Sequence, residues 1–152
     1  MLLIRCHAGA DRYAVESGHV SEVLPQVNLQ RPGGSPFWLA GLLIRRGTAT
    51  PVMDLTRLTC GSPCPNRLSS RIIVLQTELD GVDRRFGLLA ENVGLCEIRK
   101  EAEESVCRSA GPTALGSLRL DAQGVFQLLD PRLLACQDRR AILFPAAEET
   151  PE

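Results

Sequence analysis

Short apolar runs separated by turn residues recur along the whole chain. Four of them, LLIRC, RYAVE, RIIVLQTE and RRFGLLAE, are rich in aliphatic residues and are bounded by turn residues, as strands are. Two stretches have the pattern of hairpins, because Asp80-Gly81 and the segment DAQG (121–124) place turn chemistry between apolar runs. Many short strands and few helices predict an all-β barrel or sandwich with short helices.

Helical signals are confined to short segments. Asp54 and Asp130 each precede a short segment that contains Arg-Leu, and an aspartate in this place can cap the first helical turn. Pro131 suits the first position of such a helix. The segment HVSEVLPQV (19–27) is expected to form a helical turn that stops near Pro25.

The order of these elements occurs twice. Tyr13 and Phe86 stand in similar surroundings 73 positions apart, and Asp54 and Asp130 stand in similar surroundings 76 positions apart. Since the two offsets nearly agree, the chain is expected to hold two related modules of about 75 residues. The similar segments are RYAVESGHVSEV (12–23) with RFGLLAENVGLCEI (85–98), and GLLIRRGTATPVMDLTRL (41–58) with GSLRLDAQGVFQLLDPRLL (116–134).

Length and composition agree with one domain that buries a core. The chain has 152 residues, of which 44% are hydrophobic and 23% charged, as in ordinary globular proteins. We expect one domain over residues 1–140, with modules at 1–65 and 66–140, and a loose polar tail over 141–152. Neither a membrane span nor a signal peptide is apparent, so we expect a cytoplasmic protein that is not inserted in the membrane.

The charge balance argues against binding of nucleic acid. The chain has 17 basic and 18 acidic residues, a net charge of −1, and only 4% aromatic residues. Proteins that hold nucleic acid by general electrostatics need a basic face, usually with exposed aromatic side chains.

The sequence lacks the common catalytic and cofactor motifs. His7 and His19 fall in no catalytic pattern, and no serine lies in a G-x-S-x-G elbow. The segment RPGGSP (31–36) lacks the preceding strand and following helix of a phosphate-binding loop, so a turn is expected there. The acidic segment KEAEESV (100–106) is expected to be a solvated surface. These patterns point to no particular enzyme class and to no cofactor site.

Six cysteines in a chain without a signal peptide indicate reduced thiols rather than disulfides. Cys60 and Cys64 form the one close pair, and their C-x3-C spacing is permitted in zinc sites. A structural zinc site needs a second pair of ligands near the first in the fold. A metal or redox regulator that uses these two thiols is the alternative to an interaction protein, and ordinary loop cysteines are the simpler interpretation.

The segment FWLAGLLIRRGTATPVMDL (37–55) contains two apolar runs that Arg45, Arg46 and Gly47 divide. An unpaired buried charge costs several kcal/mol, so these arginines must reach water or a partner. An arginine in a turn between two core strands is held rigidly, and its planar fork pairs well with carboxylates at interfaces. The pattern fits an interaction surface and a solvated turn equally well, whereas the doublets Arg84–Arg85 and Arg139–Arg140 are expected to be solvated ends of elements.

The residues around this turn resemble the signature of CheW-like coupling domains, the adaptors of bacterial chemosensory arrays. That signature runs from a Pro-x-aromatic segment through a Gly, an Asn-Leu-Arg-Gly turn and a Pro-Val strand to an Asp-Leu helix start. The segments DRYAVESGHVSEVL, RFGLLAENVGLCEI and LGSLRLDAQGVFQLLDPRLL are similar to other parts of the family, so the resemblance covers about residues 2–136. The residues that match the signature are Pro36, Phe37, Gly41, Arg46, Gly47, Pro51, Val52, Asp54 and Leu55.

The resemblance implies a fold of two intertwined five-stranded SH3-like barrels around a shared core. It implies a non-enzymatic adaptor, without cofactor or metal, that joins the cytoplasmic tip of methyl-accepting receptors to the regulatory domain of a CheA-type histidine kinase. Such an adaptor is recruited to membrane-associated receptor arrays. Val20, Glu22, Arg46 and Gly47 fall at positions that the family associates with receptor or kinase contact.

The chain also departs from the family pattern. Ile44 stands in place of the turn asparagine and Arg45 in place of the leucine, while Ser17 and Gly18 replace aliphatic residues. Because charge at the rim of an interface steers partner choice, Arg45 joins the expected contact residues. The departures indicate a divergent coupling protein of an alternative chemosensory pathway, such as one for surface sensing or pilus motility. A further alternative keeps the fold but has the domain compete with another coupling protein and damp signalling.

Overall fold

A computed structural model describes residues 2–97, 108–112 and 114–144, in which ten strands and four short helical segments occur. The strands are β1 (Leu2–Ala8), β2 (Asp11–Glu16), β3 (Val20–Pro25), β4 (Leu39–Arg45), β5 (Thr48–Asp54), β6 (Arg71–Leu79), β7 (Val82–Glu97), β8 (Arg108–Pro112), β9 (Gly116–Asp121) and β10 (Gly124–Leu129), and the helical segments are η1 (Ser17–His19), α1 (Leu55–Cys60), α3 (Pro131–Leu134) and α4 (Gln137–Leu143). In these ranges no helix has the length and apolar character needed to cross a membrane.

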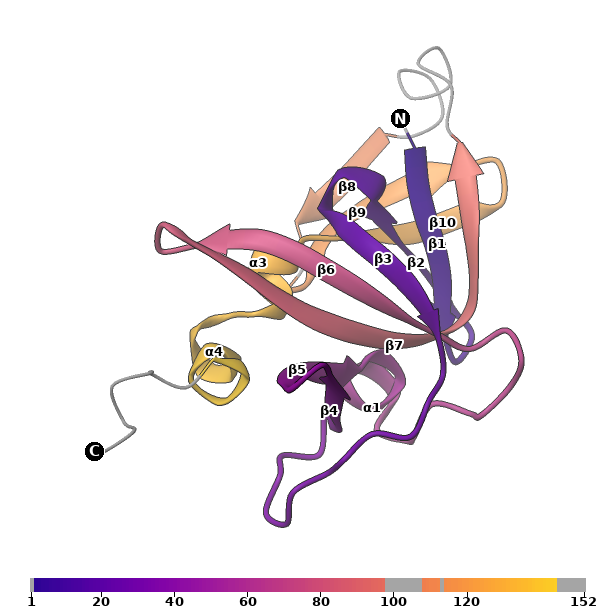
Figure 1. Ribbon diagram of the computed structural model, residues 1–152. Helices are drawn as coiled ribbons and strands as arrows, with labels where there is room; N and C mark the ends of the chain where they lie inside the picture. The colour runs from indigo at the N-terminus through magenta and orange to yellow at the C-terminus, as the bar shows by residue number, and fades with distance from the viewer. Residues whose placement is uncertain (1, 98–107, 113, 145–152) are drawn as a thin grey trace.

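The strands form two barrels that share β7. The first barrel has the order β3-β6-β7-β5-β4, and the second contains β1, β2, β10, β9 and β8. The N-terminal part of β7 pairs with β6 and β5, whereas its C-terminal part pairs with β1. This strand of 16 residues therefore passes through both barrels, and Figure 1 shows it crossing the molecule beside β6 and rising next to β1.

Each barrel takes strands from both halves of the chain. In the first barrel, β5 runs parallel to β7, and Val52 is the partner of Gly87. In the second barrel, β2 runs parallel to β10, and Ala14 is the partner of Leu128. Val52 and Leu128 are 76 positions apart and Ala14 and Gly87 are 73 apart, the same offsets as in the sequence repeat. The predicted fold class, all-β with two intertwined five-stranded barrels and short helices, is confirmed.

The largest cluster of buried side chains belongs to both barrels. Tyr13 and Val15 of β2 pack in it with Phe86 and Leu88 of β7 and with Leu134 of α3. A second cluster fills the first barrel and a small third cluster fills the second barrel. The second cluster consists of Leu43, Val52, Cys64, Ile72, Val74 and Leu89, and the third of Leu3, Ala14, Phe126 and Leu128.

Both predicted hairpins are present. β6 and β7 pair in register up to a turn at Asp80 and Gly81, whose φ angles of 52° and 78° suit a two-residue hairpin connection. β9 and β10 pair from Gly116↔Leu129 to Asp121↔Gly124.

Both predicted helix starts are also present. The Oδ1 atom of Asp54 accepts a hydrogen bond from the Arg57 amide at 3.1 Å, and the Oδ1 atom of Asp130 accepts one from the Arg132 amide at 2.9 Å. Pro131 occupies the start of α3. Each aspartate therefore satisfies a backbone donor that the helix itself leaves unpaired.

The prediction of a helical turn over 19–27 is wrong beyond His19. The short 3₁₀ segment η1 ends there, and Val20–Pro25 forms strand β3, which pairs with β6. Half-buried and exposed positions alternate along β3, as they do in a strand that covers a barrel. The strand ends at Pro25, since proline has no amide hydrogen to continue a ladder.

Three arginines of the two doublets that were expected to be solvated instead hold α4 in place. The Arg139 guanidinium donates to carbonyls at the end of α3, and Arg140 forms an ion pair of 2.8 Å with Asp80 at the β6–β7 turn. The Arg84 guanidinium lies 5.3 Å from the ring centroid of Phe144, just after α4. The expectation is therefore wrong for these three arginines, because α4 packs against the β6–β7 hairpin.

The expected start of the tail at residue 141 falls within α4. Leu143 is buried in the shared core, and the helix ends with it. Residues 145–152 and the acidic segment 100–106 lie outside the described residues.

Candidate functional site

Arg46 and Gly47 form the tip of the β4–β5 hairpin. Their φ angles are 51° and 77°, both in the left-handed region, and Arg45 and Thr48 form the last pair of the ladder before the turn. Two positive φ angles give a turn whose twist matches the flanking strands. Arginine is an uncommon residue for this conformation, which costs roughly 1–2 kcal/mol outside glycine and asparagine. Strained residues of this kind gather at functional sites.

Arg45 has a partner inside the molecule. Its Nη1 atom lies 2.8 Å from the Oε2 atom of Glu22 on β3, and the two side chains are 46% and 36% exposed. Since β3 and β4 are the two ends of the strand order in the first barrel, this ion pair joins the barrel across its seam. The isolated bridge Gln30↔Leu42 is another link of β4 to the chain that follows β3.

Arg46 differs from its neighbour. The residue is exposed, and within the described ranges it makes no hydrogen bond or ion pair. The guanidinium keeps its charge and all its donors for another molecule. Arg45 therefore links the turn to β3, whereas the Arg46 side chain is exposed at the tip of the turn.

The structure brings four of the five predicted contact residues to one end of the first barrel. Glu22 and Arg45 contact each other there, and Arg46 and Gly47 form the adjacent turn. Val20 lies two positions before Glu22 on β3, half-buried against the shared core, with a register shift between the two residues. Its contribution to a surface is therefore smaller than that of the others.

Ile44 is a residue of this surface that the sequence interpretation missed. It pairs with Ala49 across the hairpin and is 46% exposed, so an apolar side chain lies next to the turn. The signal was its departure from the family's asparagine.

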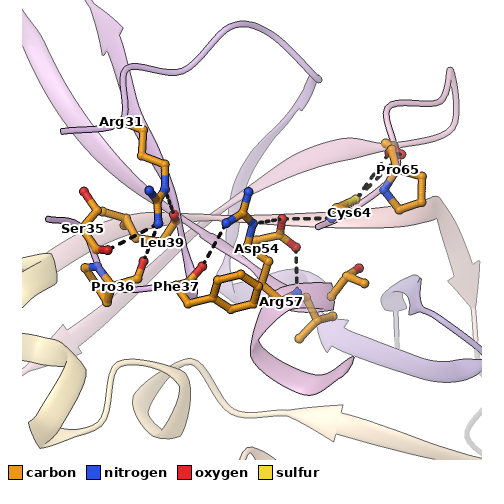
Figure 2. Close-up of polar contacts among 12 residues, drawn as sticks. Arg31, Ser35, Pro36, Phe37, Leu39, Asp54, Arg57, Cys64 and Pro65 are labelled. Carbon is orange, nitrogen blue, oxygen red and sulfur yellow. Dashed lines mark hydrogen bonds and ion pairs between the residues drawn. The ribbon is translucent and has the colours of Figure 1, made fainter. Parts of the chain in front are cut away.

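Cys60 and Cys64 lie in different surroundings. The Cys64 amide donates to the Oδ2 atom of buried Asp54 at 3.0 Å, as Figure 2 shows, and burial raises the pKa of the Cys64 thiol to about 11. Cys60 is exposed, with its Sγ atom 3.6 Å from the carbonyl oxygen of Ala8. The described residues contain no group of three or more His, Cys, Asp or Glu side chains placed to hold a metal ion. The arrangement gives the cysteine-based alternative no support.

Comparisons with known proteins agree with this architecture. The model of the CheW-like domain family matches residues 2–138. The crystal structure of the scaffolding protein TtCheW from Thermoanaerobacter tengcongensis has a TM-score of 0.72 and 17% sequence identity, over 91% of this chain and 89% of that chain. No curated protein is significantly similar in sequence. At this identity the structural likeness shows a shared fold.

Proposed function

The chain belongs to the CheW-like domain family, and from this membership we propose that it couples methyl-accepting receptors to the regulatory domain of a CheA-type histidine kinase. A scaffold role in chemotaxis-type signalling is what the family supports. The observation that carries the finer proposal is Arg46, a charged and unpaired side chain on a turn that the Arg45–Glu22 ion pair braces.

The surface around the Arg46 turn combines apolar and charged side chains, as protein interfaces do. Ile44 is 46% exposed and supplies apolar area, while Glu22, Arg45 and Arg46 supply a charged rim. A receptor hairpin or a kinase domain would be held by apolar contacts with polar groups around them. We expect modest affinity for each pair, with avidity in an array adding the remainder.

Arg45 changes the charge that a partner needs opposite this surface. Because it neutralises Glu22 within the chain, a partner at this surface needs no cation opposite that carboxylate. Arg46 still favours a carboxylate in the partner. This difference from the family pattern is our reason for placing the chain in an alternative chemosensory pathway, such as surface sensing or pilus motility.

The proposed adaptor catalyses no reaction. In this proposal it is a cytoplasmic protein, recruited to receptor arrays, that needs no metal or cofactor. Its effect on the kinase comes from the geometry in which it holds two partners.

Co-purification with candidate receptors and kinases tests the proposal. Wild-type protein is expected to retain both a clustered receptor cytoplasmic fragment and the kinase regulatory domain, and Arg46→Glu is expected to lose at least one of them. Arg85→Glu is the matched control, since Arg85 is also an exposed arginine but lies on β7. Equal retention by the wild type and Arg46→Glu would remove Arg46 from the interface.

The same preparation separates coupling from damping. A coupling protein is required for receptor control of the kinase, whereas a competitor lowers that control when it is added to a complete complex. A loss of receptor control when the protein is left out identifies a coupling protein, and a fall in that control when the protein is added identifies a competitor.

A further inference from the structure

Charge is unevenly distributed along the chain. Residues 26–71 contain six arginines and one acidic residue, Asp54, although the whole chain has a net charge of −1. This range includes the loop before β4, the β4–β5 hairpin, α1 and the loop before β6. The part of the first barrel that β4, β5 and α1 form is therefore basic, whereas β3, β6 and β7 carry the acidic residues Glu22, Glu78 and Asp83.

The arginines of this range differ in whether a carboxylate lies beside them. Arg57 lies 3.4 Å from Asp54, and Arg67 lies 3.8 Å from Glu91. Arg31, by contrast, forms no ion pair with any carboxylate in the described part of the chain, and its contacts are with backbone carbonyls. A full positive charge remains at the loop that it contacts.

Arg31 and Arg57 brace this loop from two sides, as Figure 2 shows. The Nε atom of Arg31 donates to the Leu39 carbonyl at 3.0 Å, and its Nη2 atom donates to the Pro36 carbonyl at 3.0 Å. The Nη1 atom of Arg57 lies 3.5 Å from the Phe37 carbonyl oxygen. The loop is thus fixed by contacts to its backbone.

Phe37 is the side chain that this loop presents. It is 51% exposed, and the Arg57 guanidinium lies 4.9 Å from its ring centroid. An aromatic ring held by a stacked arginine loses little conformational freedom when a partner covers it. Aromatic and arginine side chains on a rigid support are the residues that dominate binding energy at protein interfaces.

This surface is separate from the Arg46 turn. Phe37 lies just before β4 and Arg46 just after it, and a strand of seven residues spans about 20 Å. The two therefore lie at opposite ends of the strand. The inference below does not depend on what Arg46 binds.

We propose that Phe37, Arg31 and Arg57 form a docking surface for an acidic segment of a partner protein. An apolar side chain of that segment packs on the exposed face of Phe37, and a carboxylate of the segment approaches Arg31. The Nη1 atom of Arg31 donates to no group within the described residues, so it is available for this contact. Nucleic acid fits less well, because it would need many more uncompensated cations than this surface offers.

Site-specific photo-crosslinking in cells tests this proposal. The photoreactive residue p-benzoylphenylalanine replaces Phe37 in the full chain, and the crosslinked peptide is identified by mass spectrometry. The expected product is a protein segment with net negative charge and at least one apolar residue. Raising the salt concentration during crosslinking in lysate lowers the yield, because the attraction is between exposed charges.

Variants in the same background decide whether the charge matters. Arg31→Glu is expected to lower the yield roughly fivefold or more, and Arg31→Lys, which keeps the charge, to retain most of it. Arg85→Glu, at an exposed arginine on β7, should leave the yield unchanged. Leu68, which is 94% exposed and lies in the segment between α1 and β6, gives the background yield when it carries the photoreactive residue.

Four results would overturn the proposal. They are a yield at Phe37 no greater than at Leu68, a crosslinked peptide that is neutral or basic, a nucleic acid as the product, and an equal yield with Arg31→Glu. Because the yield at Leu68 and the thermal unfolding of each variant are measured alongside, a loss through misfolding is recognised separately.

Discussion

Arg46 has a backbone conformation that an arginine rarely adopts. Its φ of 51° favours asparagine or glycine, and its side chain makes no hydrogen bond or ion pair within the described chain that would offset this preference. We propose that contact with a partner is the reason for an arginine at this position.

We therefore expect Arg46→Asn to stabilise the fold while it weakens coupling. Asparagine tolerates the left-handed region, so the free energy of unfolding should rise by about 0.5–1 kcal/mol. Chemical denaturation of the variant and the wild type measures this difference, and co-purification with receptor and kinase measures the loss. Gly47→Ala, at a φ of 77°, is the control and should destabilise the same turn. A less stable Arg46→Asn protein would show that the arginine is not strained.

The Arg45–Glu22 pair should contribute little to stability and more to selectivity. Both side chains are more than a third exposed, so a double-mutant cycle with Arg45→Leu and Glu22→Gln should give a coupling energy of about 0.2–1 kcal/mol, smaller at high salt. Arg45→Leu also releases the Glu22 carboxylate and should change which receptors co-purify. A coupling energy near zero together with unchanged partners would show that the pair has neither role.

Buried thiols predict a loss of stability at alkaline pH. Burial raises the pKa of Cys6 from 9.0 to about 12 and contributes most to raising the pKa of Cys64 to about 11. Unfolded thiols ionise near their ordinary pKa while the folded ones stay neutral, so this contribution is complete below about pH 9 and is lost as pH rises through 11 to 12.

Denaturation at pH 8 and pH 10 measures this effect. Cys6→Ala should reduce the fall in unfolding free energy between the two pH values, and Cys60→Ser, which changes an exposed thiol, should not. An identical fall in the wild type and Cys6→Ala would show that Cys6 titrates normally.

Some residue roles could be predicted from the sequence, and others could not because they arise only when the sheet closes into a barrel. The turn at Arg46 and Gly47 and the helix caps at Asp54 and Asp130 are local patterns, and they were predicted. The partner of Arg45 lies 23 positions away, on a strand brought near only when the sheet curls into a barrel. No local pattern in the sequence shows that contact.

At the scale of elements, hairpins were predictable because both strands and the turn lie close together in the sequence. Strand β3, which follows η1, was not predictable in this way, because Val20, Val23 and Leu24 fit a helical as well as a strand spacing. Pairing with β6, which is far away in the sequence, decides in favour of the strand.

Gly116 tests the packing of the second barrel's hairpin. A Cβ atom there would lie 1.8 Å from the Leu128 carbonyl oxygen, which belongs to the backbone and cannot move independently. Gly116→Ala should therefore destabilise the protein by about 3 kcal/mol, measured by chemical denaturation. Gly18→Ala is the control, because nothing lies within 4 Å of the added atom, and its effect should stay within about 0.5 kcal/mol. Equal effects of the two substitutions would contradict the β9–β10 pairing.

At the scale of the whole molecule, the exchange of strands ties the two barrels together. β7 contributes to both, and each barrel contains strands from both halves of the chain. Because the shared core is continuous, the surfaces at Arg46 and Phe37 are held in a fixed relation by packed side chains. A rigid body with separate surfaces suits a protein whose role is to hold partners in a given geometry.

Control of kinase autophosphorylation by receptors, measured in a reconstituted complex, tests the central proposal most directly. Receptor, kinase and this protein are combined in membranes, and phosphate incorporation is followed with and without the receptor's ligand. We predict that ligand control requires the protein, that Arg46→Glu abolishes it, and that Arg85→Glu preserves it. Ligand control that is equal without the protein, or equal with Arg46→Glu, would contradict the proposal.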